Sequence, residues 1–173
     1  ALRPLEIAEK RGPAEMRQLE PALASDIARG VFSPDCHKVA DPLSLSRRFA
    51  DRIAGNGGTF LRETVADIEL GADGPAAVIT DQARRPVDRL VLAAGAFSKR
   101  LAARLGARLP LDTERGYHLM LPKPGVDLRV PLLVGGRRFG IIPMTHGIRL
   151  AGTAELGGIH APPNYRRARM LGP

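Results

Sequence analysis

The sequence predicts a mixed α/β (α+β) fold, in which part of a Rossmann-like, dinucleotide-binding region is followed by a mixed, mostly antiparallel sheet. Two observations lead to this expectation. Residues 90–94, Leu-Val-Leu-Ala-Ala, form a continuous apolar run of the kind that is buried on both faces of a parallel sheet. After Pro110, short alternating segments are separated by Pro- and Gly-rich loops, as in antiparallel sheets.

Residues 1–30 predict a helical segment made of two short helices. Residues 13–19 and 21–29 each have Pro at or near the start, where a helix needs no backbone N–H donor. Gly30 is suited to end the second helix, because glycine readily adopts the left-handed conformation of a C-terminal cap.

Residues 42–55 have the clearest helical pattern. Asp41 can cap the N-terminus, and Pro42 suits the first helical position. Apolar residues then recur every four positions up to Gly55, at Leu45, Phe49 and Ile53.

Residues 59–80 predict a short strand and a β-hairpin. The strand is expected at 59–62, after an Asn-Gly-Gly turn. Residues 65–70 then alternate apolar and polar side chains, turn residues follow at 71–74, and apolar residues return at 76–80.

The apolar run at 90–94 ends in a turn of small residues, 93–96. Ser98 can then cap a helix that stops at Gly106. The side chains of Leu101, Ala102 and Leu105 are expected to face the core. Strand, turn and helix together make half of a nucleotide-binding βαβ unit, in which small residues let a cofactor approach the backbone. Tight packing of strand against helix explains the same small residues equally well.

Residues 107–173 predict the antiparallel part. Strands are expected at 116–121, 130–134, 138–142 and 148–152, and a basic helix start at 165–171. The segment 152–155, Gly-Thr-Ala-Glu, either brings backbone, hydroxyl and carboxylate to a site or forms a glycine bulge with a surface Glu155. The residues alone favour the bulge.

The charge excludes few functions. The chain has 173 residues and a formal net charge of +8, but its arginines are spread along the sequence and aromatic residues are only 4%. A nucleic-acid-binding protein gathers such charge on one face and adds stacking aromatics, so a solvated basic surface is favoured. A basic nucleic-acid-binding module stays open as an alternative.

Cysteine and hydropathy point to a globular protein of a reducing compartment. With 44% apolar residues the chain can form a core, and the lone Cys36 can make no internal disulfide. No apolar run approaches the ~18 residues of a membrane span, and no signal peptide pattern is present. We therefore expect a soluble, cytoplasmic protein, and the missing initiator Met suggests a piece of a longer chain.

No metal site is expected. The four histidines, His37, His118, His146 and His160, lack the spacings that place two ligands together. His118, in the strand at 116–121, and His146, in a loop, could line a pocket. No Gly-x-Ser-x-Gly nucleophile motif occurs.

In this order, the segments resemble the D-amino-acid oxidase/dehydrogenase family of FAD-dependent amine oxidoreductases, and within it the bacterial D-amino acid dehydrogenases (small subunit). The resemblance covers roughly residues 30–171. Each motif is loose, but the ordered set is specific: Asp41-Pro42 through Asn56-Gly57-Gly58, Glu63–Ile68, Asp88–Ser98, Leu109-Pro110, Arg115–His118, Ile142-Pro143 and Arg149–Glu155.

The resemblance implies FAD as cofactor and a place for it. Val65 would contact the adenosine through its backbone, and the turn of Ala93, Ala94 and Gly95 would pack beside the dinucleotide. Gly140 and Ile141 would belong to the sheet that covers the flavin. Residues 1–30 would then be a helical segment, 31–106 part of the FAD-binding domain, and 107–173 part of the substrate-binding sheet domain.

The resemblance also implies the reaction, in which a hydride passes from the substrate Cα to the flavin and the resulting imine hydrolyses to a keto acid and ammonia. No side-chain base is obligatory, so the protein mainly orients the substrate. Arg115, Tyr117 and His118 are the candidates for this role, with His146 behind them. An ordinary strand aromatic and a surface charge explain Tyr117 and Arg115 at least as well.

Departures from the family pattern predict an interior fragment. No Gly-x-Gly-x-x-Gly motif for the FAD pyrophosphate occurs, and the C-terminal segment that supplies a carboxylate-binding Arg in several members is missing. Some oxidases place a substrate-binding Tyr where this chain has Phe139 and Gly140. We therefore expect that the 173 residues alone are inactive and do not retain FAD.

The implied partners are a small amino acid substrate and an electron acceptor, either oxygen or a membrane quinone chain. Nucleic acid is not expected, and a homo-oligomer is left open. If the acceptor is a quinone, the protein would be peripheral at the inner face of the membrane.

Overall fold

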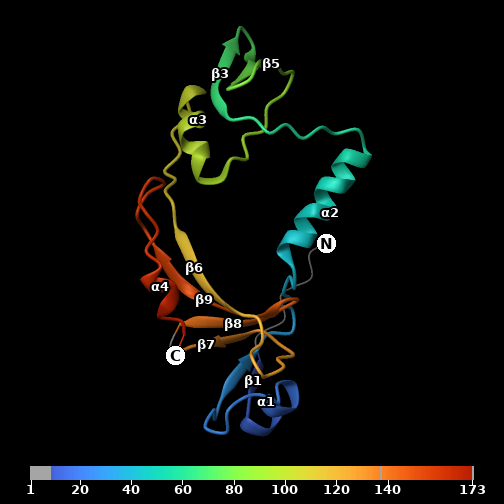
Figure 1. Cartoon of the computed structure of the whole chain (residues 1–173), viewed down its shortest axis with the longest axis vertical. Coiled ribbons are helices and arrows are strands. Elements are labelled where there is room, and N and C mark those ends of the chain that lie inside the picture. Colours follow the sequence, from blue (N-terminus) through green and yellow to red (C-terminus); the bar gives the residue numbers. More distant parts are fainter. Residues whose placement is uncertain (1–8, 137, 173) are drawn as a thin grey trace. The chain divides into compact units, whose positions relative to one another are not determined.

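The computed structural model describes residues 9–136 and 138–172. These residues form two compact units, each with its own sheet and coloured along the chain in Figure 1. Of the described residues, the first comprises 9–50, 116–136, 138–154 and 164–172, and the second comprises 51–115 and 155–163. The three domain ranges expected from the sequence follow chain order, and they remain a prediction.

A four-stranded sheet is the centre of the first unit. Its strands lie in the order β6-β9-β8-β7, with bounds β6 Arg115–Leu121, β7 Leu132–Val134, β8 Phe139–Met144 and β9 Gly147–Glu155. β8 pairs antiparallel with both β7 and β9. The predicted antiparallel strands are thus confirmed, although β7 is shorter than the predicted 130–134 and β9 is longer than the predicted 148–152.

Side-chain alternation gives this sheet two different faces. Cross-strand partners share a face, so Ile141 lies with Leu150 and Pro143 with Ile148. Three of these four residues are buried, and this is the buried face. The pairs Gly140 with Ala151 and Ile142 with Arg149 lie on the other face. We call it the open face, because all four of its residues are partly exposed.

Segments from both ends of the chain cover the buried face. The N-terminal one consists of β1 Glu9–Arg11, α1 Pro13–Leu19 and β2 Gly30–Phe32, in which β1 and β2 pair antiparallel. The C-terminal one contains α4 Arg166–Arg169, and Tyr165 beside it contacts Tyr117 of β6. The expected helix at 13–19 is confirmed, and the expected basic helix at 165–171 is present as a single short turn.

The expected helix at 21–29 is wrong, because these residues form turns and irregular backbone. Side chains in α1 and at its C-terminal cap hold them in that form. The Ala22 N–H donates to the Glu20 carboxylate at 3.1 Å, and Arg17 donates to the Ser25 carbonyl at 2.8 Å. Pro21, expected at the start of a second helix, therefore instead follows the C-terminal cap of α1.

Helix α2, Pro42–Gly55, begins and ends as predicted. The Ser44 N–H donates to the Asp41 carboxylate at 3.1 Å, so Asp41 is the cap. The Ser44 hydroxyl and N–H together hold the pKa of Asp41 below its usual value. The apolar stripe of Leu45, Phe49 and Ile53 is exposed, with Phe49 62% accessible.

The second unit contains a three-stranded antiparallel sheet, β3 Val65–Gly71, β4 Gly74–Thr80 and β5 Arg84–Pro86. The predicted hairpin is confirmed, and its core contains Ile68 and Ala77. The strand predicted at 59–62 is wrong, because these residues are irregular. Their polar groups bind the β4–β5 connection instead, as when Gln82 donates to the Arg62 carbonyl at 3.1 Å.

The parallel strand predicted at 90–94 is also absent, since these residues are irregular in the described chain. A strand buried on both faces needs a neighbouring strand to pair with, and no described strand pairs with this segment. Val91 is accordingly 86% exposed. The apolar composition identified a segment suited to burial, whereas strand formation depends on a partner.

A 3-10 turn, η1 Gly95–Phe97, leads into helix α3, Ser98–Arg104. Leu101 and Ala102 are buried as predicted, whereas Leu105 is only partly buried. Gly106 ends the helix with φ +75°, as predicted. The expectation that Ser98 caps the helix is wrong. Ser98 lies inside it, and its hydroxyl accepts the Ala94 N–H at 3.0 Å.

We expect Glu20 to make the largest polar contribution to the stability of the first unit. Its side chain is 1% exposed and accepts the backbone N–H groups of Arg129 at 2.6 Å, Ala22 at 3.1 Å and Val130 at 3.2 Å. Burial alone would raise the pKa of Glu20, but these three donors outweigh it, so the pKa is lowered. Glu20→Gln should cost about 1–3 kcal/mol at neutral pH, measured by urea unfolding.

The pH dependence tests the same interaction. Because the folded-state pKa of Glu20 is lowered, its stabilisation is present above the unfolded value of about 4.3 and is lost as the pH falls through the folded value. The gap between wild type and Glu20→Gln should therefore narrow in acid. Glu114→Gln, at an exposed position, is the matched control. An equal, pH-independent loss in both variants would contradict the assignment.

Candidate functional site

The open face brings two ionisable side chains together. Alternation along β6 places His118 on the same face as Gly116, opposite to Tyr117. The His118 Nδ1 lies 3.5 Å from Nη2 of Arg149, a residue of β9 on the open face. His118 therefore also belongs to the open face. The guanidinium Nε of Arg149 is buried and has no hydrogen-bond partner among the described residues.

Arg149 was not among the candidates drawn from the sequence. A signal for it exists, because Arg149 stands between Ile148 and Leu150, which are 5% and 9% exposed. In a strand, the residue between two core residues points to the opposite face. An arginine between two core residues of a strand is therefore a signal for a charged group on the opposite face.

Tyr117 lies on the buried face and is 7% exposed. Its hydroxyl accepts the Asn164 N–H at 2.7 Å, and its ring packs edge-on against Tyr165 with 6.4 Å between centroids. The side chain thus fastens the C-terminal segment to the sheet. Its role in orienting a substrate remains a prediction.

Arg115, the first residue of β6, belongs to the second unit. Its Nη2 donates to the Ala161 carbonyl at 2.7 Å, and its Nη1 lies 3.9 Å from a carboxylate oxygen of Glu155. Glu155 is partly buried, so the expectation of a surface Glu155 is wrong. A Cβ at Gly152 would lie 2.5 Å from the Cα of Phe139, so this position has no room for a side chain, and the expected glycine bulge remains a prediction.

His146 lies in the turn between β8 and β9 and is exposed. The next residue, Gly147, packs against the end of β6, where a Cβ would lie 2.2 Å from the Leu121 carbonyl. Leu121 is four residues beyond Tyr117, or about 13 Å along the strand. The structure therefore places His146 at the other end of the sheet from Tyr117, and does not bring the two together.

Two of the expected cofactor-binding positions, Gly140 and Ile141, lie on opposite faces of β8. Gly140 is on the open face, where a Cβ would meet nothing nearer than the Ala151 carbonyl at 3.6 Å. Ile141 is on the buried face and lines a cavity. Only Gly140 thus shares a face with His118 and Arg149.

The remaining expected cofactor contacts lie in the second unit. The Val65 carbonyl already accepts Nη2 of Arg100 at 3.1 Å. Ala93, Ala94 and Gly95 are exposed, and a Cβ at Gly95 would have no neighbour within 4 Å. The turn of small residues is therefore accessible to a ligand. The roles of these four residues in FAD binding remain predictions.

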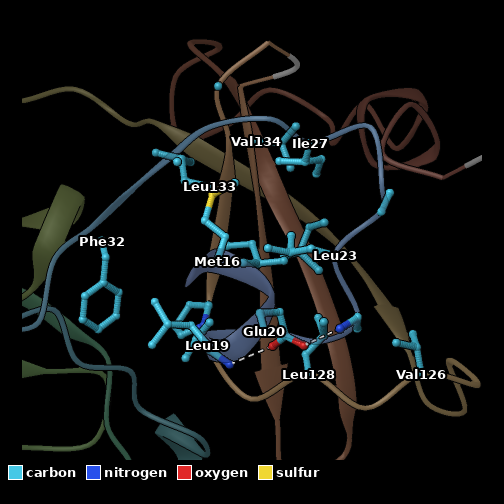
Figure 2. A pocket seen from close by; sticks show the side chains of 18 of the residues that line it. Met16, Leu19, Glu20, Leu23, Ile27, Phe32, Val126, Leu128, Leu133 and Val134 are labelled. Carbon is cyan, nitrogen blue, oxygen red and sulfur yellow. Dashed lines mark hydrogen bonds between the residues drawn. The ribbon is translucent and has the colours of Figure 1, made fainter. Parts of the chain in front are cut away.

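A cavity of about 710 Å³ lies on the buried face of the sheet, between α1, the following turns and strands β7 to β9. Figure 2 shows the apolar side chains that line it, including Met16, Leu23 and Leu128, with the Glu20 carboxylate at its edge. The Glu20 carboxylate is already satisfied by backbone donors and would repel an anion. The cavity suits apolar groups and does not suit the carboxylate of an amino acid.

No helix in the described ranges is long and apolar enough to cross a membrane. In the same residues, no group of three or more His, Cys, Asp and Glu side chains is placed to hold a metal ion.

We expect Tyr117→Phe to lower the stability of the protein by about 1 kcal/mol, because the Asn164 N–H loses its acceptor in a part-buried hydrogen bond. Urea unfolding measures the change. Tyr165→Phe, at a position that is 64% exposed, should change stability by less than half as much. Equal stability of Tyr117→Phe and wild type would contradict the fastening role of the hydroxyl.

Comparison with known proteins identifies the family of this chain. A model of the DAO family, described as FAD dependent oxidoreductase, matches residues 2–172. A D-amino-acid oxidase of Bradyrhizobium diazoefficiens is 34% identical over 157 residues, which are 91% of this chain and 37% of the relative. A D-amino acid dehydrogenase of Paramagnetospirillum magneticum is 33% identical over 169 residues, which are 93% of this chain and 39% of the relative.

Two solved structures share the fold. Glycine oxidase from Bacillus cereus aligns with a TM-score of 0.73 and 22% identity, over 94% of this chain and 45% of that one. L-proline dehydrogenase from P. horikoshii aligns with a TM-score of 0.79 and 18% identity, over 95% and 46%. The chain spans less than half the length of each of these four proteins. It belongs to the DAO family of FAD-dependent oxidoreductases.

Proposed function

We propose that the chain is part of an FAD-dependent oxidoreductase that oxidatively deaminates a D-amino acid. The observation that carries the proposal is the family match over residues 2–172, together with 34% and 33% identity to proteins named D-amino-acid oxidase and D-amino acid dehydrogenase. No comparison supports the alternative of a nucleic-acid-binding module. The domain ranges 31–106 and 107–173 would then carry parts of cofactor and substrate binding.

The described residues fit FAD in part. The exposed turn of small residues at 93–95 and the open face with Gly140 leave room for a ligand. The sequence has no Gly-x-Gly-x-x-Gly turn for the pyrophosphate, and the Val65 carbonyl is bound to Arg100. Each of these surfaces would lie beside the cofactor, whereas the glycine motif that holds its phosphates does not occur in this sequence.

When bound, FAD would supply the two-electron oxidation of the substrate amine to an imine, which water would hydrolyse to a keto acid and ammonia. The protein contributes orientation, and the open face offers a half-buried guanidinium above small and apolar neighbours for that purpose.

The full-length gene product should oxidise D-amino acids and not their L-enantiomers. The measurement is anaerobic bleaching of the flavin absorbance by a panel of both series, followed by turnover with an artificial electron acceptor. Reoxidation by oxygen or only by a quinone analogue then distinguishes an oxidase from a dehydrogenase, which the names of the relatives leave open. A flavin that no amino acid bleaches would refute the proposal.

The purified 173-residue chain should not retain FAD. Because the pyrophosphate motif is missing, we expect a colourless protein and no stoichiometric binding by equilibrium dialysis. The full-length gene product, purified in the same way, is the control. A yellow, stoichiometric complex of the 173-residue chain would show that these residues suffice for the cofactor.

A further inference from the structure

The cavity on the buried face has the size of a small-molecule site, and all of its lining residues belong to the first unit. Its volume of about 710 Å³ lies within the range of about 300–1,000 Å³ that is typical of ligand sites. The side chains that line it are mostly apolar (Figure 2). Phe32 is the one aromatic residue among the described lining residues. Flexible aliphatic walls of this kind suit an alkyl chain better than a planar ring, which favours aromatic neighbours.

The opening of the cavity leaves apolar side chains in water. Val31 of β2 and Leu133 of β7 both line the cavity, and they are 66% and 82% exposed. Ile27, in the segment before β2, lines it as well and is exposed. An apolar group that entered between these side chains would remove their surface from water, and this favours binding.

Three of the described lining residues carry a charge, and two of them already have partners. Arg11 forms ion pairs with Glu9 and Glu15. Glu20 accepts three backbone N–H groups. Arg29 is exposed, and no carboxylate in the described ranges forms an ion pair with it. Of the three, Arg29 is therefore the group that can accept an anionic ligand.

Arg29 and Glu20 lie at different ends of the cavity. Figure 2 shows Ile27 at the end opposite to Glu20 and Leu128, and Arg29 follows Ile27 by two residues. A carboxylate bound to Arg29 is therefore kept away from the Glu20 carboxylate. From there an alkyl chain can extend along the apolar walls toward Leu128.

We propose that this cavity binds a long-chain alkyl carboxylate, with its alkyl chain between α1 and the sheet and its carboxylate on Arg29. The site is on the opposite face of the sheet from His118 and Arg149, so it is separate from the deamination proposed above. A neutral alcohol of the same length would bury the same chain but leave Arg29 without an anion. A short carboxylate would leave the apolar walls uncovered. The two features together therefore select this class of ligand.

The alkyl part of the proposal is tested by calorimetric titration of the full-length gene product with octanoate, decanoate and laurate, each below its micelle concentration. One saturable site is expected, with an affinity that rises about fourfold for each added methylene, because each one leaves water. Leu23→Trp enlarges a side chain in the middle of the cavity and should weaken laurate binding by about 10-fold or more. Leu43→Trp, at an exposed position of α2, is the matched control and should bind as wild type does.

The carboxylate part is tested by comparing octanoate with 1-octanol. Arg29→Met should weaken octanoate binding by about 3- to 10-fold, because the charge-assisted hydrogen bonds are lost, and should leave 1-octanol binding unchanged. A merely structural effect would weaken both ligands equally. Arg29→Lys, which keeps the charge, should retain part of the preference for octanoate. Arg48→Met removes an exposed arginine of α2 and should leave both affinities unchanged.

Three results would overturn the proposal. The first is the absence of saturable laurate binding, which would show that other residues of the full-length protein fill the cavity. The second is an equal loss of octanoate and 1-octanol affinity in Arg29→Met. The third is laurate binding that shifts the flavin absorbance and survives Leu23→Trp, which would place the ligand beside the cofactor.

Two features of the design keep the outcome distinct from other failures. If Leu23→Trp does not fold, Val126→Trp is titrated in its place, because Val126 also lines the cavity and is exposed. The titrations need no turnover. If the full-length protein oxidised no amino acid, the proposed function would fail, whereas the Arg29-dependent binding of alkyl carboxylates would still be measured.

Discussion

The alternation of side chains along β9 is the constraint on which the first unit depends. Ile148 and Leu150 enter the core, and Arg149 between them faces away. A shift of register by one residue would bury the guanidinium and expose the core. Two glycines oppose such a shift. Gly147 with φ +124° packs against the Leu121 carbonyl, and Gly152 with φ +159° packs against Phe139, positions where a Cβ has no room.

The two faces of the sheet differ because other segments of the chain cover only one of them. Segments from both ends of the chain close the buried face, and two polar anchors hold them, the Glu20 carboxylate against the loop before β7 and the Tyr117 hydroxyl against Asn164. A protein group that is satisfied internally is not available to a ligand. For this reason the anchors mark the structural face, whereas on the other face the buried Nε of Arg149 has no hydrogen-bond partner among the described residues.

Local signals were reliable where the interaction that stabilises an element is itself local. The helices at 13–19 and 42–55 and the hairpin at 65–80 have their caps, turns and periodicity within a few residues. The strand predictions at 90–94 and 59–62 were wrong, because a strand exists only when another strand pairs with it. The helix prediction after Pro21 was wrong because the side chains of Arg17 and Glu20 bind the backbone of these residues.

The sequence by itself determined the family resemblance, the antiparallel character of residues 115–155 and the positions of most helices, since order of motifs and periodicity are properties of the chain alone. Only the tertiary structure decided which candidate residues share a face. It separated Tyr117 from His118, moved His146 to the far end of the sheet and joined Arg149 to His118. The physical reason is that strand register, which sets these neighbours, depends on pairing across the sheet.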